Sequence, residues 1–287
     1  MNPNNTVIEI KTLSLSAKDV SILDSITLTI PAGAVVGLVG RNGAGKSSLL
    51  RCMAGLAVPT QGTCQLLGYS CQNFPDSTLE RLGYVAQTPD LFEWMEVLEM
   101  LRAIGQAYPR WSEQRCVDLA HRLDLPLEIK VKNLSAGDQQ KLAVVLALGH
   151  DPDVLLLDEP VSNLDPITRS EFMRTLFVDR AVEEAEDTSL NAARTIVISS
   201  HLLTDLERVV SHVAFIRNGR LQLFDAWDAM LEHFRQVNSA EVAGSQTGLV
   251  CNNPLRKLSI VDTRKLPHFI DAGRRLSLNE LFVELNA

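Results

Sequence analysis

Eight consecutive residues have the types and the spacing of a loop that binds phosphate groups. They are Gly40, Arg41, Asn42, Gly43, Ala44, Gly45, Lys46 and Ser47, and they fit the pattern G-x-x-x-x-G-K-[ST] without a mismatch. In such a loop the glycines let backbone N–H groups turn inward around an anion, the lysine reaches the β- and γ-phosphates, and the hydroxyl ligates Mg²⁺. The alternative is a glycine-rich turn that matches the pattern by chance.

The segments on either side of this loop favour the phosphate-binding interpretation. Residues 34–39 form an apolar run that predicts a buried strand, and residues 47–54 predict a helix. A helix that starts at the end of the loop adds the positive end of its dipole to the site. We therefore expect Ser48, in the first turn of this helix, to belong to the nucleotide-binding residues together with the loop.

Two adjacent acidic residues, Asp158 and Glu159, follow the apolar run 154–157, which predicts a buried strand. Ligands of open α/β sheets gather at the carboxyl ends of the strands. We expect Asp158 to hold Mg²⁺ and Glu159 to act as the general base that polarises an attacking water. The alternative is a strand end that simply turns toward solvent.

The segment Leu134-Ser135-Ala136-Gly137-Asp138 resembles the L-S-G-G-Q signature of ABC-type ATPases. Together with the phosphate loop and the acidic pair, it is far more specific than any one of these motifs. The resemblance implies that two such domains dimerise head to tail, so that Ser135 and Gly137 of one contact the ATP held by the other. Ala136 and Asp138 depart from the pattern. Ser135 and Asp138 also have the spacing of a capping box, in which the carboxylate bonds back to the Ser135 N–H and points away from the phosphate.

The same resemblance assigns roles to three more side chains. Gln87 matches the glutamine that contacts Mg²⁺ and the attacking water, and His201 matches the histidine that touches the γ-phosphate. Lys46 joins Gln87, Glu159 and His201 in the catalytic set. Asp165 matches the D-loop aspartate, and because Pro166 follows it, Asp165 is also a good N-cap for a helix.

The pattern of elements predicts an α/β fold, a P-loop NTPase with a mixed, mainly parallel sheet. Predicted strands at 6–15 and 26–30 indicate an N-terminal antiparallel β portion, and residues of about 88–150 indicate an inserted helical subdomain. We expect an ABC-type ATPase domain over 1–225 and a C-terminal accessory or regulatory region, a small α+β tail, over 226–287.

Within the C-terminal region the sequence gives weaker signals. Residues 239–253 are polar, like a linker, and 257–261 suggest a strand. Ser277 and Glu280 form a capping box that predicts the start of a last helix, which ends near Leu285. The acidic run 183–187 reads as a solvated helix end or loop.

Composition limits the classes of partner and the location. The 287 residues carry a net charge of −8, so no direct contact with nucleic acid is expected. No apolar run approaches ~18–20 residues, and the first residues do not look like a signal peptide. The five scattered cysteines indicate reduced thiols. We therefore expect a cytoplasmic protein, and the family resemblance implies that it is peripheral on the inner face of the cell membrane.

By resemblance, the chain is expected to be the ATP-binding and ATP-hydrolysing subunit that powers a membrane transporter with a separate permease. It would work as a homodimer, or as a heterodimer with a similar ATPase. Segments 91–95, 108–111 and 277–285 bear on this expectation. The first is either a permease interface or a helix core, and the other two resemble ATPases of small bacterial exporters.

Two other functions stay open at this point. One is a soluble ABC-type ATPase that acts in protein assembly or remodelling without a permease. The other is a nucleotide-binding scaffold that barely hydrolyses ATP because of Asp138. The presence of Glu159 and His201 argues against the scaffold.

Overall fold

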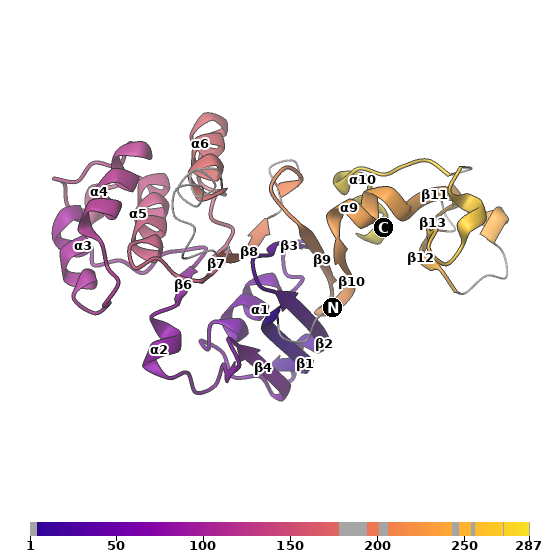
Figure 1. Ribbon diagram of the computed structural model, residues 1–287, viewed down its shortest axis with the longest axis horizontal. Helices are drawn as coiled ribbons and strands as arrows, with labels where there is room; N and C mark the ends of the chain where they lie inside the picture. Colours follow the sequence, from indigo (N-terminus) through magenta and orange to yellow (C-terminus); the bar gives the residue numbers. More distant parts are fainter. Residues whose placement is uncertain are drawn as a thin grey trace.

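The computed structural model describes residues 5–177, 194–200, 206–242, 247–253, 256–271 and 273–286, and a six-stranded sheet runs through the middle of them (Figure 1). Its strand order is β10 (Arg220–Ala226), β9 (His212–Arg217), β3 (Val35–Val39), β8 (Thr195–Ser200), β7 (Val154–Asp158) and β6 (Leu82–Val85). Every neighbouring pair is parallel except β10 with β9. The predicted mainly parallel sheet is thereby confirmed.

An antiparallel sheet of the N-terminal residues lies beside this central sheet. Its order is β2 (Val20–Pro31), β1 (Thr6–Ala17), β4 (Gln61–Leu66) and β5 (Tyr69–Ser70). Helix α1 (Lys46–Met53) packs between the two sheets, and the short α2 (Asp76–Leu79) leads into β6. The predicted N-terminal antiparallel portion is therefore present.

The central sheet is buried on both faces, which explains its long apolar runs. Along β7 the side chains alternate between two cores: Val154 and Leu156 pack on the side of α1, and Leu155 and Leu157 pack on the opposite side. Each of these four side chains has no exposed surface. Burial on both faces is typical of parallel sheets covered by helices, and it fixes the register of the strands.

The helical subdomain consists of α3 (Val97–Gly105), α4 (Glu113–Arg122), the 3₁₀ turn η2 (Val131–Asn133) and α5 (Ala136–Leu148), grouped at one end of the molecule (Figure 1). Helix α6 (Pro166–Phe177) follows β7. None of the helices in the described residues is long and apolar enough to cross a membrane.

Segment 91–95 is not helical, although its apolar spacing continued into a predicted helix. Helix α3 begins only at Val97, because Glu96 and Glu99 form a capping box that fixes its first turn. The segment before the cap is held by backbone hydrogen bonds to residues that follow α4. One of them runs from the Val131 N–H to the Met95 carbonyl at 3.0 Å. Trp94 is 67% exposed, so it does not belong to a helix core.

The C-terminal residues contain a third sheet where the sequence suggested a linker. Its order is β11 (Phe234–Asn238), β13 (Leu258–Asp262) and β12 (Leu249–Asn253). The linker prediction for 239–253 was wrong because η3 (Ser239–Val242) and β12 lie within that range. Val242 is buried in a small apolar cluster that the polar local sequence does not reveal.

Three further elements complete this region: α9 (Trp227–His233), η4 (Pro267–Phe269) and α10 (Leu278–Asn286). The predicted capping box is confirmed, since the Ser277 N–H donates to the Glu280 carboxylate at 2.9 Å. Arg217, at the end of β9, donates to the backbone carbonyl of Leu285 at 3.0 Å. This bond ties the last turn of α10 to the central sheet. The acidic run 183–187 lies outside the described residues.

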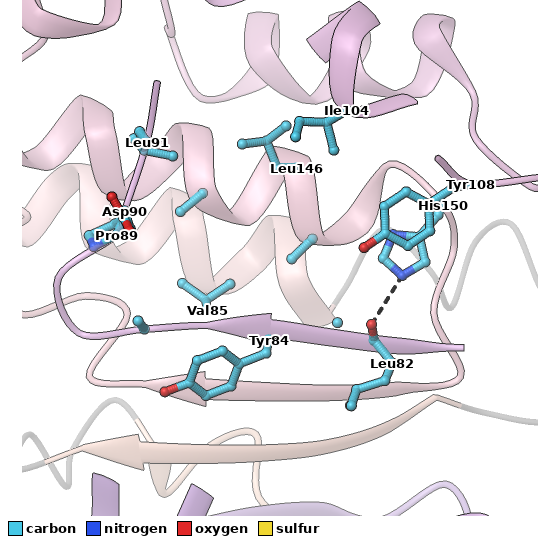
Figure 2. Close-up of a pocket in the computed structure, with 14 residues that line it drawn as sticks. Leu82, Tyr84, Val85, Pro89, Asp90, Leu91, Ile104, Tyr108, Leu146 and His150 are labelled. Carbon is cyan, nitrogen blue, oxygen red and sulfur yellow. Dashed lines mark hydrogen bonds between the residues drawn. The ribbon is translucent and has the colours of Figure 1, made fainter. Parts of the chain in front are cut away.

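A buried histidine joins the helical subdomain to the edge of the central sheet. The ring of His150 is 2% exposed, its Nε2–H donates to the Leu82 carbonyl at 3.3 Å, and the ring of Tyr108 stacks on it with centroids 4.2 Å apart (Figure 2). Burial, reinforced by the positive charges of Arg110 and Arg194, lowers the pKa of His150 below its ordinary value.

We predict that this histidine makes the fold less stable in mild acid. Unfolded His150 binds a proton near pH ~6.5, whereas the folded ring binds it only at a lower pH. The contribution of the neutral His150 ring to the unfolding free energy is therefore fully present above this pH range and is lost as the pH falls through it. The loss in unfolding free energy between about pH 7.5 and about pH 5.5, measured with urea, should be smaller in His150→Asn than in the wild type. His268→Asn, at an exposed position, is the control. An equal pH dependence in His150→Asn and the wild type would contradict the prediction.

Candidate functional site

The phosphate loop opens into a cavity of about 380 Å³ at the carboxyl end of β3. The cavity brings together residues of the loop and of the first turn of α1 with three residues from other parts of the sequence. Its lining is Ile22, Asn42, Gly43, Gly45, Lys46, Ser47, Ser48, Gln87 and Glu159. Gln87 was predicted to contact Mg²⁺ and the attacking water, and Glu159 was predicted to polarise that water. Both residues line the cavity of the loop.

Two glycines give the loop its shape. Gly45 has φ of +106°, and a Cβ there would lie 2.7 Å from the Leu23 side chain, so no larger residue fits without movement. Gly43 has φ of +79°, and a Cβ there would meet only open space, which is the space that a ligand uses. Gly45 caps α1 without a side-chain hydrogen bond. The first N–H groups of α1 are therefore not capped by a side chain, as anion binding requires.

Lys46 is held at the base of the loop by acceptors on three sides. Its Nζ donates to the carbonyls of Gly40 at 2.8 Å and Arg41 at 3.3 Å, and it lies 3.6 Å from Glu159 Oε1. Lys46 and Glu159 are each 6% exposed. A buried ammonium and a buried carboxylate are each costly without the other. An anion that attracts Lys46 therefore also changes the surroundings of Glu159.

The carboxyl end of β7 carries the acidic pair. Asp158 is 3% exposed and lies in register with Ser199 of β8. Glu159 comes directly after the strand and has φ of +49°, a left-handed conformation that is uncommon for a residue with a side chain. This turn separates the two carboxylates, so that Glu159 lines the cavity while Asp158 remains in the sheet.

The side chains predicted to bind Mg²⁺ fit that ion by their chemistry. Ser47, Gln87 and Asp158 offer hydroxyl, amide and carboxylate oxygens, and Mg²⁺ prefers hard oxygen ligands. The described residues contain no group of three or more His, Cys, Asp or Glu that could enclose a metal ion. A few oxygen donors beside a phosphate cavity match the way Mg²⁺ binds, shared between protein and nucleotide.

The signature segment forms the start of α5. The Ser135 hydroxyl accepts a hydrogen bond from the Asp138 N–H at 3.1 Å and donates to the Asp138 carboxylate at 2.7 Å. The carboxylate was predicted to bond to the Ser135 N–H, but its partner in the structure is the Ser135 hydroxyl. Its other oxygen lies 3.0 Å from Lys141 Nζ, so its charge is paired within the same helix.

The signature residue Gly137 lies beside the D-loop, and none of Ser135, Gly137 and Asp165 lines the phosphate cavity. A Cβ on Gly137 would lie 3.2 Å from the Asn163 carbonyl. Asp165 caps α6, accepting hydrogen bonds from the N–H groups of Ile167 at 3.0 Å and Thr168 at 3.2 Å. The structure therefore separates Ser135, Gly137 and Asp165 from the residues around Lys46. His201 lies outside the described residues.

Two residues at the site were missed by the sequence reasoning. Ser199 bonds to both Asp158 and the Glu159 backbone. Gln140 of α5, with no exposed surface, donates to the Ala86 carbonyl at 3.4 Å, directly before Gln87. Ser199 lies inside an apolar strand pattern and Gln140 inside a helix, so only the three-dimensional contacts distinguish them.

The fold and the cavity define a P-loop nucleotide-binding protein. Comparison with known proteins identifies the family within this class. A family model described as "ABC transporter" matches residues 23–162. The ABC transporter ATP-binding protein YtrB of Bacillus subtilis is 30% identical over 236 residues, which are 82% of this chain and 77% of that protein. The bacitracin transport ATP-binding protein BcrA of Bacillus licheniformis is 27% identical and aligns with 98% of this chain and 90% of its own.

A solved structure agrees with these sequence relatives. The structure titled as the ATP binding subunit of an ABC transporter has a TM-score of 0.68 and 28% identity, and the match covers 78% of this chain and 92% of that one. The chain belongs to the family of ABC transporter ATP-binding proteins. It binds and hydrolyses ATP as a subunit of a transporter.

We predict that Asp138→Gln keeps or raises the rate of ATP hydrolysis. The carboxylate holds the hydroxyl of Ser135, which the family resemblance assigns to the γ-phosphate, and the amide removes a negative charge from that position. The rate should be measured as phosphate release, with Glu171→Gln at an exposed position of α6 as the charge-loss control. A loss greater than about tenfold, or ~1.4 kcal/mol of transition-state stabilisation, would contradict this prediction.

Proposed function

We propose that this chain powers export through a separate membrane permease, and that it works as a homodimer with ATP between the two copies. The observation that carries the permease part is an apolar groove of about 310 Å³ between β6 and α5 (Figure 2). Leu91, Ile104 and Leu146 line it from the side of the helical subdomain, and Tyr84 and Val85 line it from β6.

The groove is suited to transmit movement to the nucleotide site. Pro89 and Asp90 line it, and they follow Gln87 by two and three residues. Exposed Phe92 and Trp94 follow the lining residue Leu91 in the sequence by one and three residues, with ring centroids 5.2 Å apart. Exposed aromatic side chains next to an apolar groove are typical of interfaces. An occupant of the groove therefore contacts the segment that carries Gln87.

The separation of the site residues supports the dimer. The cavity around Lys46 contains the phosphate loop, Gln87 and Glu159, whereas Ser135 and Gly137 belong to another part of the chain. Because one chain carries both halves, two identical copies can complete two sites in a head-to-tail dimer. Asp165 would then lie between the copies.

Hydrolysis in this proposal starts with the release of Glu159. The phosphates of ATP attract Lys46. The ion pair between Lys46 Nζ and Glu159 Oε1, which are 3.6 Å apart, then weakens. Glu159 then takes a proton from the water that attacks the γ-phosphorus, while the bond to ADP breaks. Mg²⁺, when bound by Ser47, Gln87 and Asp158, supplies positive charge to the phosphate oxygens. His201 is proposed to contact the γ-phosphate.

Two segments of the sequence favour export over import, and a relative named for transport supports the transport role. BcrA, which by its name acts in bacitracin transport, aligns with nearly the whole chain, including the C-terminal residues. Residues 108–111 and 277–285 resemble ATPases of small bacterial exporters. Docking on a permease would hold the protein at the cytoplasmic face of the cell membrane. Residues 1–225 would form the ATPase domain and 226–287 an accessory, regulatory region.

We predict that Glu159→Gln traps the closed dimer together with its permease. The amide cannot take the proton from water, so ATP should stay bound and the dimer should stay closed. The tagged variant is purified with ATP and Mg²⁺ from detergent-solubilised membranes of the source cells, with Glu171→Gln as control. A stoichiometric multi-span membrane protein is expected with Glu159→Gln. Recovery only as a soluble dimer, or with soluble partners, would favour an ATPase that acts in assembly or remodelling.

We predict that Trp94→Ala weakens this capture at least tenfold while ATP hydrolysis by the isolated protein stays within about twofold. Trp94 is 67% exposed and follows the groove residue Leu91 by three positions, so its loss removes contact area from a partner and little from the fold. The readout is the amount of permease recovered per mole of tagged protein. Tyr69→Ala, an exposed aromatic on β5, is the control. Equal recovery with both variants would place the partner elsewhere.

A further inference from the structure

Ser199, at the carboxyl end of β8, has one hydroxyl that contacts both acidic residues of the site. The side chain has no exposed surface. Its Oγ–H donates to Asp158 Oδ1 at 2.7 Å, and the same Oγ accepts a hydrogen bond from the Glu159 N–H at 2.9 Å. Asp158 and Ser199 lie directly opposite each other in the parallel β7–β8 pair, which brings the hydroxyl to this position.

Only a group that both donates and accepts can make this pair of bonds. An ionised carboxylate is purely an acceptor, and a backbone N–H is purely a donor. Asp158 and Glu159 are 3% and 6% exposed, so water has little access to replace a missing partner. A serine hydroxyl meets both requirements with one atom, and an alanine meets neither.

The backbone at Glu159 needs to be held in place. Its φ of +49° is in the left-handed region, and such conformations persist where the surroundings fix them. Ser199 binds the N–H of Glu159 on one side. On the other side the hydroxyl of Ser162 donates to the Glu159 carbonyl at 3.0 Å. Between these two anchors the side chain leaves toward Lys46 in the phosphate cavity.

We propose that Ser199 is a positioning residue for hydrolysis, which sets the carboxylate of Asp158 for the metal ion and the backbone of Glu159 for the attacking water. The proposal rests on the roles proposed above for Asp158 and Glu159. It separates two parts of the site: the phosphate loop binds nucleotide independently of Ser199, whereas metal binding and turnover depend on it.

The test compares Ser199→Ala with Ser199→Thr and Ser259→Ala in the full chain. Threonine restores the hydroxyl. Ser259 is a matched control, because it is also a buried serine whose hydroxyl bonds to two side chains, but it lies in the C-terminal sheet. Four quantities are measured: kcat and KM for MgATP, affinity for Mn²⁺ by electron paramagnetic resonance with a non-hydrolysable ATP analogue, affinity for a fluorescent ATP analogue in EDTA, and melting temperature.

In Ser199→Ala we expect kcat to fall at least tenfold, KM to change less than threefold, and Mn²⁺ affinity to fall at least fivefold. Nucleotide affinity in EDTA should stay within twofold of the wild type. Ser199→Thr should recover kcat to within threefold, and Ser259→Ala should lower the melting temperature without changing kcat or Mn²⁺ affinity.

Three results would overturn the proposal. The first is an unchanged kcat and Mn²⁺ affinity in Ser199→Ala. The second is a fall in nucleotide affinity in EDTA that is as large as the fall in Mn²⁺ affinity. The third is that Ser259→Ala loses as much kcat as Ser199→Ala when the two variants have the same melting temperature. A wild type that turns over no MgATP would instead contradict the proposed function, and the Mn²⁺ measurement would still decide the role of Ser199.

Discussion

Parallel strands end at the same edge of a sheet, and the nucleotide site depends on this constraint. β3, β6, β7 and β8 run in one direction, so the phosphate loop, the segment of Gln87, the acidic pair and Ser199 all lie at or just beyond the carboxyl ends of their strands. These four groups lie far from one another in the sequence. The apolar side chains that alternate between the two faces of the sheet fix the register, and the register places the polar groups at its edge.

Charge at this edge is balanced within the protein. Lys46 is surrounded by two carbonyl oxygens and the carboxylate of Glu159. A buried charge without a partner is costly, and this buried cation and this buried anion each have a partner inside the chain. Nucleotide binding therefore exchanges one set of ionic contacts for another, and the stability of the fold does not rest on an unpaired charge.

Most of the fold and most of the residues that line the phosphate cavity could be predicted because each has a local signal. The phosphate loop has a fixed spacing, Asp158 and Glu159 end an apolar run, and Ser277 and Glu280 form a capping box. The signals failed where a contact is made between distant residues. Val242 and β12 are ordered by a cluster that the local composition hides, and Ser199 reaches Asp158 only because β8 lies beside β7.

The strand order also determines when the site can form during synthesis of the chain. β3 carries the phosphate loop near the N-terminus, but its two neighbours in the sheet are β8 and β9, which end at Ser200 and Arg217. A growing chain therefore contains the whole loop sequence long before the neighbouring strands β8 and β9 have been synthesised. Pairings over such sequence separations form late. A ribosome-bound fragment that stops before β8 has no completed phosphate site, so the nascent protein does not turn over ATP before it is nearly finished.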